Sequence, residues 1–139
     1  MIRLWDPAVD APGELADVWN DHYGTVLFGL QHFERLNPAN TIVAQEPEGL
    51  VACAFLMDGG GPFALLSEIV MRHRQGRHRL MRDVIQFAEG ICHDRGIAWF
   101  NGILEMDGSA AESFLRLMRR HAWDAQYLGE RPMYCRRLS

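Results

Sequence analysis

Two glutamates lie in or at the end of apolar, strand-like segments. Glu68 lies in the segment Ser67–Met71, and Glu105 ends a second such segment, Ala98–Glu105. A carboxylate on a strand can accept a proton, directly or through water, when burial raises its pKa. The alternative is a polar residue on a strand flank for Glu68 and a surface turn residue for Glu105. The sequence therefore offers two candidates for a general base.

A basic turn follows the first of these strands and leads directly into a helix. The turn, Arg72–Arg79, is rich in arginine and histidine, and apolar residues then recur every three to four positions over 80–92. This spacing is typical of a helix with one buried face. Free backbone N–H groups and the helix dipole at such a junction favour a bound anion. The alternative is a strand–helix unit whose arginines are only solvated.

Other kinds of active site find little support in the sequence. The six histidines show no metal-ligand spacing beside a cysteine or a third ligand, so we expect no metal site. No Cys–His or Ser–His pairing can be identified. The glycines of Asp58–Pro62 are followed by neither a lysine nor a helix, so we interpret them as a hairpin connection rather than a phosphate-binding loop.

The composition is that of a globular protein. The chain has 139 residues, 48% of them hydrophobic and 23% charged, which favours a single domain over residues 1–139. Three widely separated cysteines indicate reduced, buried thiols. No apolar run reaches the length of a membrane span, and the first residues lack the apolar core of a signal peptide. We therefore expect a cytoplasmic protein that does not contact membranes.

The charges are unevenly distributed along the chain. Residues 1–71 hold two arginines against ten acidic residues, residues 72–139 hold twelve arginines against eight, and lysine is absent. This split favours an anionic partner for the second half, or else reflects only the surfaces of its helices. The arginines lack interleaved aromatic residues and the net charge is -4, so nucleic acid is not the expected partner.

Hydrophobic periodicity predicts an α/β chain in which helices pack on a mixed sheet, in the order β-α-α-β-β-β-α-β-α-β-β. The first half is expected to contain a strand at 2–5, a helix begun by Asp10 and Pro12, a second helix through Val26, Leu30 and Phe33 that ends before Pro38, and a hairpin of 41–45 and 50–57. A strand at 63–71, a helix that Gly96 ends and a strand at 98–105 are expected to follow. The last elements are a helix at 109–122, begun by the capping box of Ser109 and Glu112, and two short strands within 124–138.

This order resembles the GCN5-related N-acetyltransferase (GNAT) family over nearly all of the chain, most clearly over Glu68–Arg82 and Asp107–Trp123. The resemblance implies a GNAT-like acyl-CoA N-acyltransferase fold, acetyl-CoA or another acyl-CoA as cofactor, and a small-molecule or peptide amine as acceptor. It also implies that the strand lends backbone groups to the pantetheine arm, that the turn wraps the pyrophosphate, and that Glu68 is the general base. The cofactor-binding residues so implied are Ile69, Val70, Met71, Gln75, Gly76, Arg77, His78, Arg79 and Leu80.

Several positions depart from the family's motifs. His78 and Leu80 stand where the family has small residues that let the backbone approach phosphate closely, so arginine side chains would hold the phosphates instead. Met118 occupies the place of a tyrosine that often protonates the departing thiolate, and Ala111 that of an asparagine. Two residues near the C-terminus could replace the missing acid or could be packing residues: Tyr127 and Tyr134.

Two functions therefore stay open. The first is an acetyl-CoA-dependent N-acyltransferase with a degenerate pyrophosphate motif, acting in the cytoplasm. The second is a catalytically inactive GNAT-like structural or interaction protein. In that respect the chain resembles the small GNAT-like internal virion proteins of short-tailed phages, which share its length, its basic helix start and its missing tyrosine. Either function is compatible with a homo-oligomer or a larger assembly.

Overall fold

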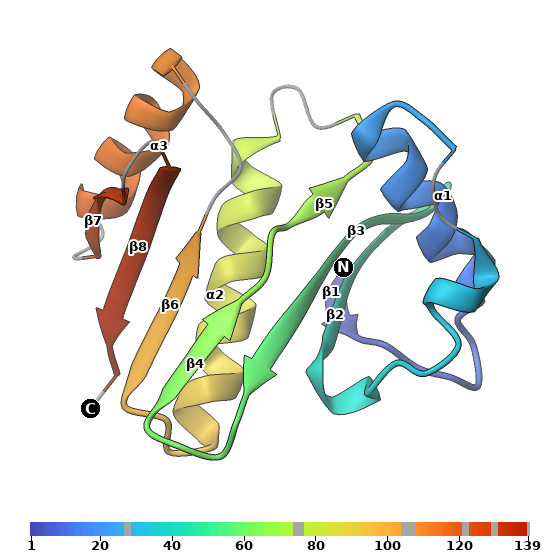
Figure 1. Cartoon of the computed structure of the whole chain (residues 1–139), viewed down its shortest axis with the longest axis horizontal. Helices are drawn as coiled ribbons and strands as arrows, with labels where there is room; N and C mark the ends of the chain where they lie inside the picture. The colour runs from blue at the N-terminus through green and yellow to red at the C-terminus, as the bar shows by residue number, and fades with distance from the viewer. Residues whose placement is uncertain (27–28, 74–76, 104–107, 121–122, 129–130, 139) are drawn as a thin grey trace. The chain divides into compact units, whose positions relative to one another are not determined.

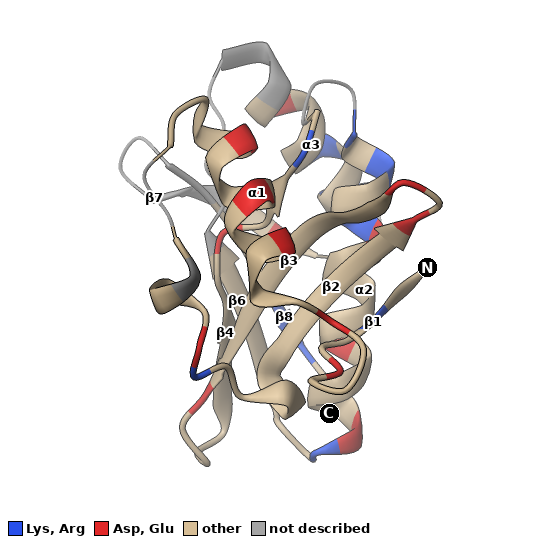
Figure 2. Cartoon of the chain, turned by 90° about the vertical axis from the view of Figure 1, so that its right-hand side faces the viewer, with Lys and Arg blue, Asp and Glu red and all other residues tan. Residues whose placement is uncertain are grey.

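The computed structural model describes residues 1–26, 29–73, 77–103, 108–120, 123–128 and 131–138 (Figure 1). Within them the elements are β1 (Ile2–Leu4), α1 (Pro12–Tyr23), the 3-10 turns η1 (Leu30–His32) and η2 (Pro38–Asn40), β2 (Thr41–Glu46), β3 (Gly49–Asp58), β4 (Phe63–Leu66), β5 (Val70–Met71), α2 (His78–Asp94), β6 (Trp99–Ile103), α3 (Gly108–Arg120), β7 (Asp124–Leu128) and β8 (Arg131–Arg137). Figure 2 shows the charged residues on the same ribbon, with acidic positions following one another along α1.

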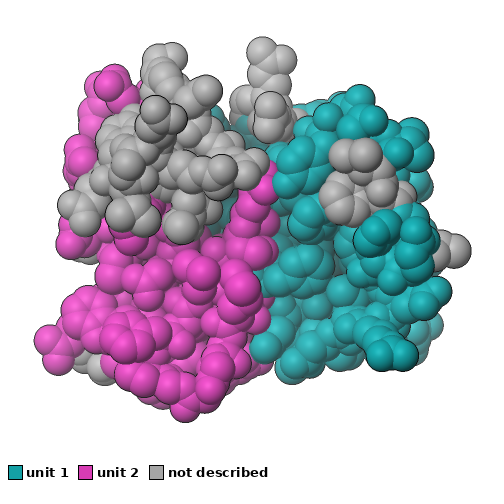
Figure 3. Space-filling model, viewed as in Figure 1, with its two compact units in different colours: residues 1–55, 69–87 teal, residues 56–68, 88–139 magenta. Residues whose placement is uncertain are grey.

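The chain forms two compact units (Figure 3). The first comprises Met1–Phe55 and Ile69–Phe87, and the second comprises Leu56–Glu68 and Ala88–Ser139. Strand β3 and helix α2 each contribute residues to both units.

The first unit contains antiparallel strands in the order β1-β2-β3-β5. Helix α1 begins at Pro12, whose fixed φ suits the first helical turn, and ends at Gly24, which adopts φ +69°. Apolar residues of the helix and strands meet in a core of Trp5, Leu15, Ala16, Val18, Phe33, Val43, Leu50, Cys53 and Val70. This core fixes α1 against the strands of its unit.

The second unit contains the end of β3 followed by β4, β6, β8 and β7 in spatial order. The pairing of β4 with β6 is parallel, and the other pairings are antiparallel. Three aromatic rings pack together in its core: the ring centroids of Trp123 and Tyr134 lie 5.3 Å apart, and Phe100 lies 5.7 Å and 5.9 Å from them.

The structure confirms the fold class and most of the expected elements. The hairpin is β2–β3, Gly96 ends the central helix with φ +73°, and the two tail strands pair with each other. The long strand expected at 63–71 is divided into β4 and β5. Leu66 pairs with Leu56 and Val70 pairs with Cys53. The chain thus advances four residues from Leu66 to Val70 while β3 advances three residues from Leu56 to Cys53. This one-residue mismatch is a β-bulge at Ser67–Ile69.

One local prediction was wrong. The second helix is represented by a single 3-10 turn, Leu30–His32, and Val26 of its supposed buried face is 89% exposed. The first helix, α1, starts at Pro12 as predicted; Ala11 is its N-cap residue, and Asp10 lies just before it. Both Asp10 carboxylate oxygens accept hydrogen bonds of 2.7 Å from Arg3, which joins β1 to the segment that enters the helix. No helix in the described part of the chain is long and apolar enough to span a membrane.

Candidate functional site

Strand β5 has one edge that is not used for strand pairing. In the described part of the chain, β4 pairs with β6 from Phe63–Trp99 to Leu66–Gly102, whereas β5 pairs with β3 alone. The backbone N–H of Arg72 donates to the carbonyl of Val51 on β3 at 2.8 Å. Because alternate amides of a strand point to opposite sides, the N–H of Met71 points away from β3. His73 lies in the turn that follows β5 and has φ +49°. We call these two amides, one in the strand and one in the turn, the outer edge of β5.

The C-terminal turn of α1 occupies this outer edge. His22 Nδ1 accepts a 3.1 Å hydrogen bond from the backbone N–H of Met71, and Asp21 Oδ2 accepts a 3.1 Å hydrogen bond from the N–H of His73. The imidazole is buried with 9% of its surface exposed, and its ring packs edge-on against Tyr23 at 4.9 Å. An Nδ1 that accepts a hydrogen bond belongs to a neutral ring protonated on Nε2. These contacts have no local signature in the sequence, because their partners are about fifty residues apart.

The backbone positions expected to bind a pantetheine arm lie at this strand. Val70 and Met71 form β5, and Ile69 belongs to the bulge that precedes it. All three side chains are buried. Their side chains therefore belong to the core, and the backbone N–H of Met71 is directed toward α1.

Acidic residues of the first unit pair with the basic turn. Arg77 Nη1 lies 2.5 Å from Glu46 Oε1 at the end of β2, and the guanidinium lowers the pKa of that carboxyl. Arg72 Nη2 lies 3.7 Å from Asp17 Oδ2 on α1. The turn thus contains cations in position for an anion, but two of them already have carboxylate partners. Neither acidic partner was identified from the sequence.

The remaining predicted phosphate-binding positions surround the start of α2. His78 is its first residue, Arg79 is exposed, and Leu80 is half-buried. Gln75 and Gly76 lie outside the described residues. The N-terminal N–H groups of α2 are therefore close in sequence to His78 and Arg79, whose polar ends could face an anion. They are also close to Leu80, whose apolar side chain could not bind one.

One of the two candidate bases lies among the described residues. Glu68 is half-buried within the bulge, and its carbonyl accepts a hydrogen bond of 3.2 Å from Ser67 Oγ. Glu105 lies outside the described residues. The geometry therefore leaves Glu68 as the candidate that can be described.

Met118 is fully enclosed within α3 of the second unit. It is 2% exposed, and its neighbours on the buried face of the helix, Phe114 and Leu115, are each 1% exposed. Tyr134 is likewise 1% exposed, and burial raises the pKa of its hydroxyl far above the ordinary value. Tyr134 is therefore a packing residue rather than a proton donor, and the side chain of Tyr127 lies outside the description.

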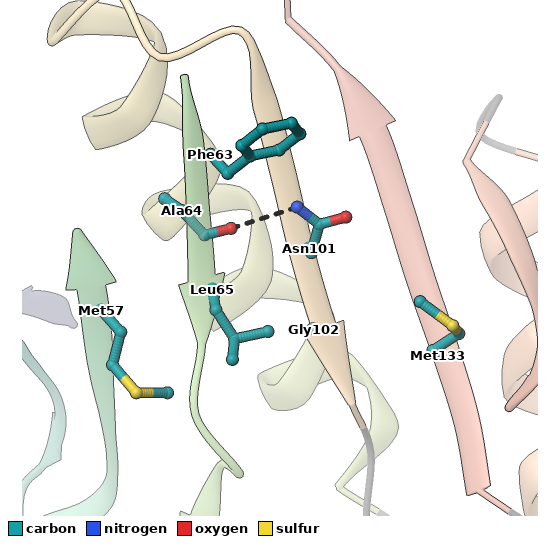
Figure 4. A pocket seen from close by; sticks show the side chains of 7 residues that line it. All are labelled: Met57, Phe63, Ala64, Leu65, Asn101, Gly102 and Met133. Carbon is teal, nitrogen blue, oxygen red and sulfur yellow. Dashed lines mark hydrogen bonds between the residues drawn. The ribbon is translucent and has the colours of Figure 1, made fainter. Parts of the chain in front are cut away.

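A shallow apolar hollow of about 360 Å³ opens on the second unit (Figure 4). It is lined by Met57, Phe63, Ala64, Leu65, Asn101, Gly102 and Met133. The Asn101 amide donates to the carbonyl of Ala64 at 3.4 Å, which holds its side chain across β4 and β6 (Figure 4). Phe63 is 61% exposed and Met57 is 50% exposed, so an apolar group could rest here.

The described thiols are not poised for nucleophilic chemistry. Burial raises the pKa of Cys53 to about 12 and that of Cys92 to about 11. A thiol with such a pKa is protonated at neutral pH and is a weak nucleophile. These cysteines are core residues.

Comparisons with known proteins identify the fold. No protein-family model and no curated protein sequence matches the chain. Among solved structures, a probable acetyltransferase from Staphylococcus epidermidis has 14% identity and a TM-score of 0.69, covering 100% of this chain and 99% of its own. A GNAT-family acetyltransferase from Listeria monocytogenes has 13% identity and a TM-score of 0.65, covering 99% and 94%. Diaminobutyrate acetyltransferase from Paenibacillus lautus, solved with its substrate and coenzyme A, has 9% identity and a TM-score of 0.68, covering 97% and 92%. The chain therefore has the fold of the GCN5-related N-acetyltransferases.

Proposed function

We propose that the protein is an acyl-CoA-dependent N-acyltransferase that transfers an acyl group, in the first instance acetyl, to the amine of a small molecule or peptide. The observation that carries this proposal is the outer edge of β5, where the N–H of Met71 points away from β3 immediately before the basic turn and α2. Coenzyme A bound to one protein of similar fold supports the choice of cofactor.

The residues of this chain fit such a cofactor in their chemistry. The N–H groups of Met71 and His73 would donate to its amide carbonyls, as a neighbouring strand would accept them. Arg77 and the backbone N–H groups at the start of α2 would bind its phosphates. When bound, an acyl-CoA would supply the thioester that donates the acyl group: the C–N bond to the amine would replace the C–S bond, with the coenzyme A thiolate as leaving group. Glu68 would accept the proton that the attacking amine loses, directly or through water.

Acetyl-CoA binding and turnover test this proposal directly. We expect calorimetry at low salt to detect binding, and Arg77→Glu to weaken it. In a turnover assay with a panel of amines, Glu68→Gln should lower kcat by about 10²–10⁴-fold and leave cofactor affinity unchanged. Glu34→Gln is the matched control, because Glu34 is an exposed turn residue. The absence of any binding or thermal shift at millimolar acetyl-CoA, in the parent and in variants of His22 and Asp21, would exclude the enzyme.

The base assignment can be tested separately from the activity. If Glu105→Gln causes the loss of kcat and Glu68→Gln does not, then Glu105 is the base. Equal losses in both variants would indicate that the two carboxylates act on the same proton or on successive steps. A normal kcat in both variants would mean that neither Glu68 nor Glu105 is the general base.

A non-catalytic GNAT-fold protein with a structural or interaction role is the second candidate. It is favoured by the hydrogen bonds from α1 that occupy the outer edge of β5, and by the enclosed Met118 at the position of the family's acid. In this case the outer edge is part of the packed fold rather than a ligand site. Such a protein would neither bind acetyl-CoA nor gain affinity for it when those hydrogen bonds are removed.

A further inference from the structure

The outer edge of β5 is already satisfied by side chains. The N–H groups of Met71 and His73 are the two that an extended ligand would meet, and each donates to a side chain of α1 at 3.1 Å. The acceptors, His22 and Asp21, are adjacent in sequence and lie in the last turn of the helix, before its C-cap Gly24. A single helical turn therefore supplies one acceptor for the last amide of β5 and one for an amide of the turn that follows it.

A ligand that pairs with this edge must replace both acceptors. A backbone N–H has a single hydrogen, and a ligand carbonyl cannot share it with the imidazole or the carboxylate at full strength. The burial of His22 and its edge-on packing with Tyr23 mean that the imidazole cannot leave Met71 without disturbing the end of the helix. Binding at the edge and displacement of this turn are thus coupled.

We propose that the C-terminal turn of α1, through His22 and Asp21, is an internal competitor that closes the outer edge of β5 and is displaced when an extended, amide-bearing ligand binds there. The proposal rests on the proposed function for the nature of that ligand, an acyl-CoA. Displacement costs the hydrogen bonds of the closed state, so the ligand's affinity is lower than that of an edge left open.

Removing one acceptor should therefore strengthen cofactor binding. His22→Phe keeps an aromatic ring against Tyr23 but cannot accept from Met71, whereas His22→Asn places Oδ1 near the position of Nδ1 and restores the acceptor. Asp21→Ala removes the acceptor for His73 from an exposed position. Asp17→Ala removes the same charge from the same helix without releasing a β5 amide, so it controls for electrostatic effects. The probe is acetyl-CoA, measured by calorimetry.

We expect His22→Phe and Asp21→Ala each to bind acetyl-CoA about three- to tenfold more tightly than the parent, as loss of one competing hydrogen bond implies. His22→Asn should bind as the parent does, and Asp17→Ala should show a smaller gain than Asp21→Ala. Without cofactor, amide hydrogen exchange at Met71 and His73 should be faster in the two uncapped variants, and acetyl-CoA should restore the protection.

The outcomes separate this inference from the proposed function. If the parent binds acetyl-CoA and the folded His22→Phe and Asp21→Ala variants bind no more tightly, the internal competitor is refuted and the acyltransferase stands. Binding by the variants alone would support the competitor. If neither the parent nor any variant binds, both the acyltransferase and the competitor are refuted. Should His22→Phe fail to fold, Asp21→Ala decides by the same comparison.

Discussion

Gly102 is the position at which a one-atom change should have the largest effect on the second unit. A Cβ built on Gly102 would lie 2.1 Å from both Cζ and Oη of Tyr134 and 2.6 Å from its Cε1. Ordinary contact begins at 3.4 Å, so the ring would have to move by about 1.3 Å. Tyr134 is 1% exposed and packs against Phe100 and Trp123, so it has no free space on its other side.

Gly102→Ala must therefore either overpack this core or expel the ring. Overpacking costs about 1–3 kcal/mol, and loss of a buried aromatic ring costs about 3–5 kcal/mol. We expect a loss of about 2–4 kcal/mol in the free energy of unfolding, and a fall of roughly 6–16 °C in the unfolding midpoint for a chain of this size. The measurements are urea unfolding and thermal unfolding followed by circular dichroism.

Two comparisons make this prediction specific. A Cβ on Gly90, within α2, meets nothing within 4 Å, so Gly90→Ala should stabilise the protein by about 0.5–1 kcal/mol. In a Tyr134→Leu background the clashing ring is absent, and Gly102→Ala should cost less than about 1 kcal/mol. A Gly102→Ala protein within about 0.5 kcal/mol of the parent would refute the close packing of Tyr134 on this glycine.

Three further predictions concern other parts of the chain. Met118→Tyr adds volume and a buried hydroxyl. If Met118 only packs, the variant should lose about 2–4 kcal/mol in the free energy of unfolding measured in urea and show no activity. Increased acetyl-CoA turnover would instead mean that α3 lies beside the reacting thioester. Glu46→Gln should release Arg77 and strengthen acetyl-CoA binding about two- to fivefold at low salt, with the gain fading at high salt; an unchanged affinity in calorimetry would mean that Arg77 does not meet the cofactor. Arg3 lowers the pKa of Asp10 in the folded state, so the pair stabilises the protein above the unfolded pKa of about 3.9, and this contribution is lost as the pH falls through the folded pKa. Asp10→Asn should therefore lower the free energy of unfolding by about 1–3 kcal/mol at pH 7 and by progressively less below about pH 4. A cost that does not change with pH would contradict the ion pair.

Local patterns were sufficient for the elements whose signals are local. The hairpin follows from two apolar runs around Glu46–Gly49, and the end of the central helix follows from Gly96, whose positive φ favours glycine. The helix expected through Val26 and Phe33 rested on a few apolar residues at helical spacing. Phe33 is buried as expected, but Val26 is exposed, and a short stretch of this kind carries too little periodicity to distinguish an α-helix from successive turns.

The candidate site depended on contacts that have no local signature. The strand–turn–helix could be located from sequence, because its residues are contiguous. The side chains that occupy it could not: His22 and Asp21 precede the amides they accept from by 49 and 52 residues, and Glu46 precedes Arg77 by 31. Such pairs form because α1 and β2 pack in the first unit. Composition and periodicity carry no information about that packing.

These contacts also change the meaning of the charge asymmetry. Twelve arginines in the second half of the sequence, against ten acidic residues in the first, suggested a partner of negative charge. At the basic turn the structure supplies that charge from within the chain, since Glu46 pairs with Arg77 and Asp17 lies beside Arg72. An anionic ligand at this turn would have to replace Glu46 or Asp17 as the partner of an arginine. Affinity at such a site is set by the difference between two sets of ion pairs, so the acidic residues of α1 and β2 tune the site as directly as the arginines do.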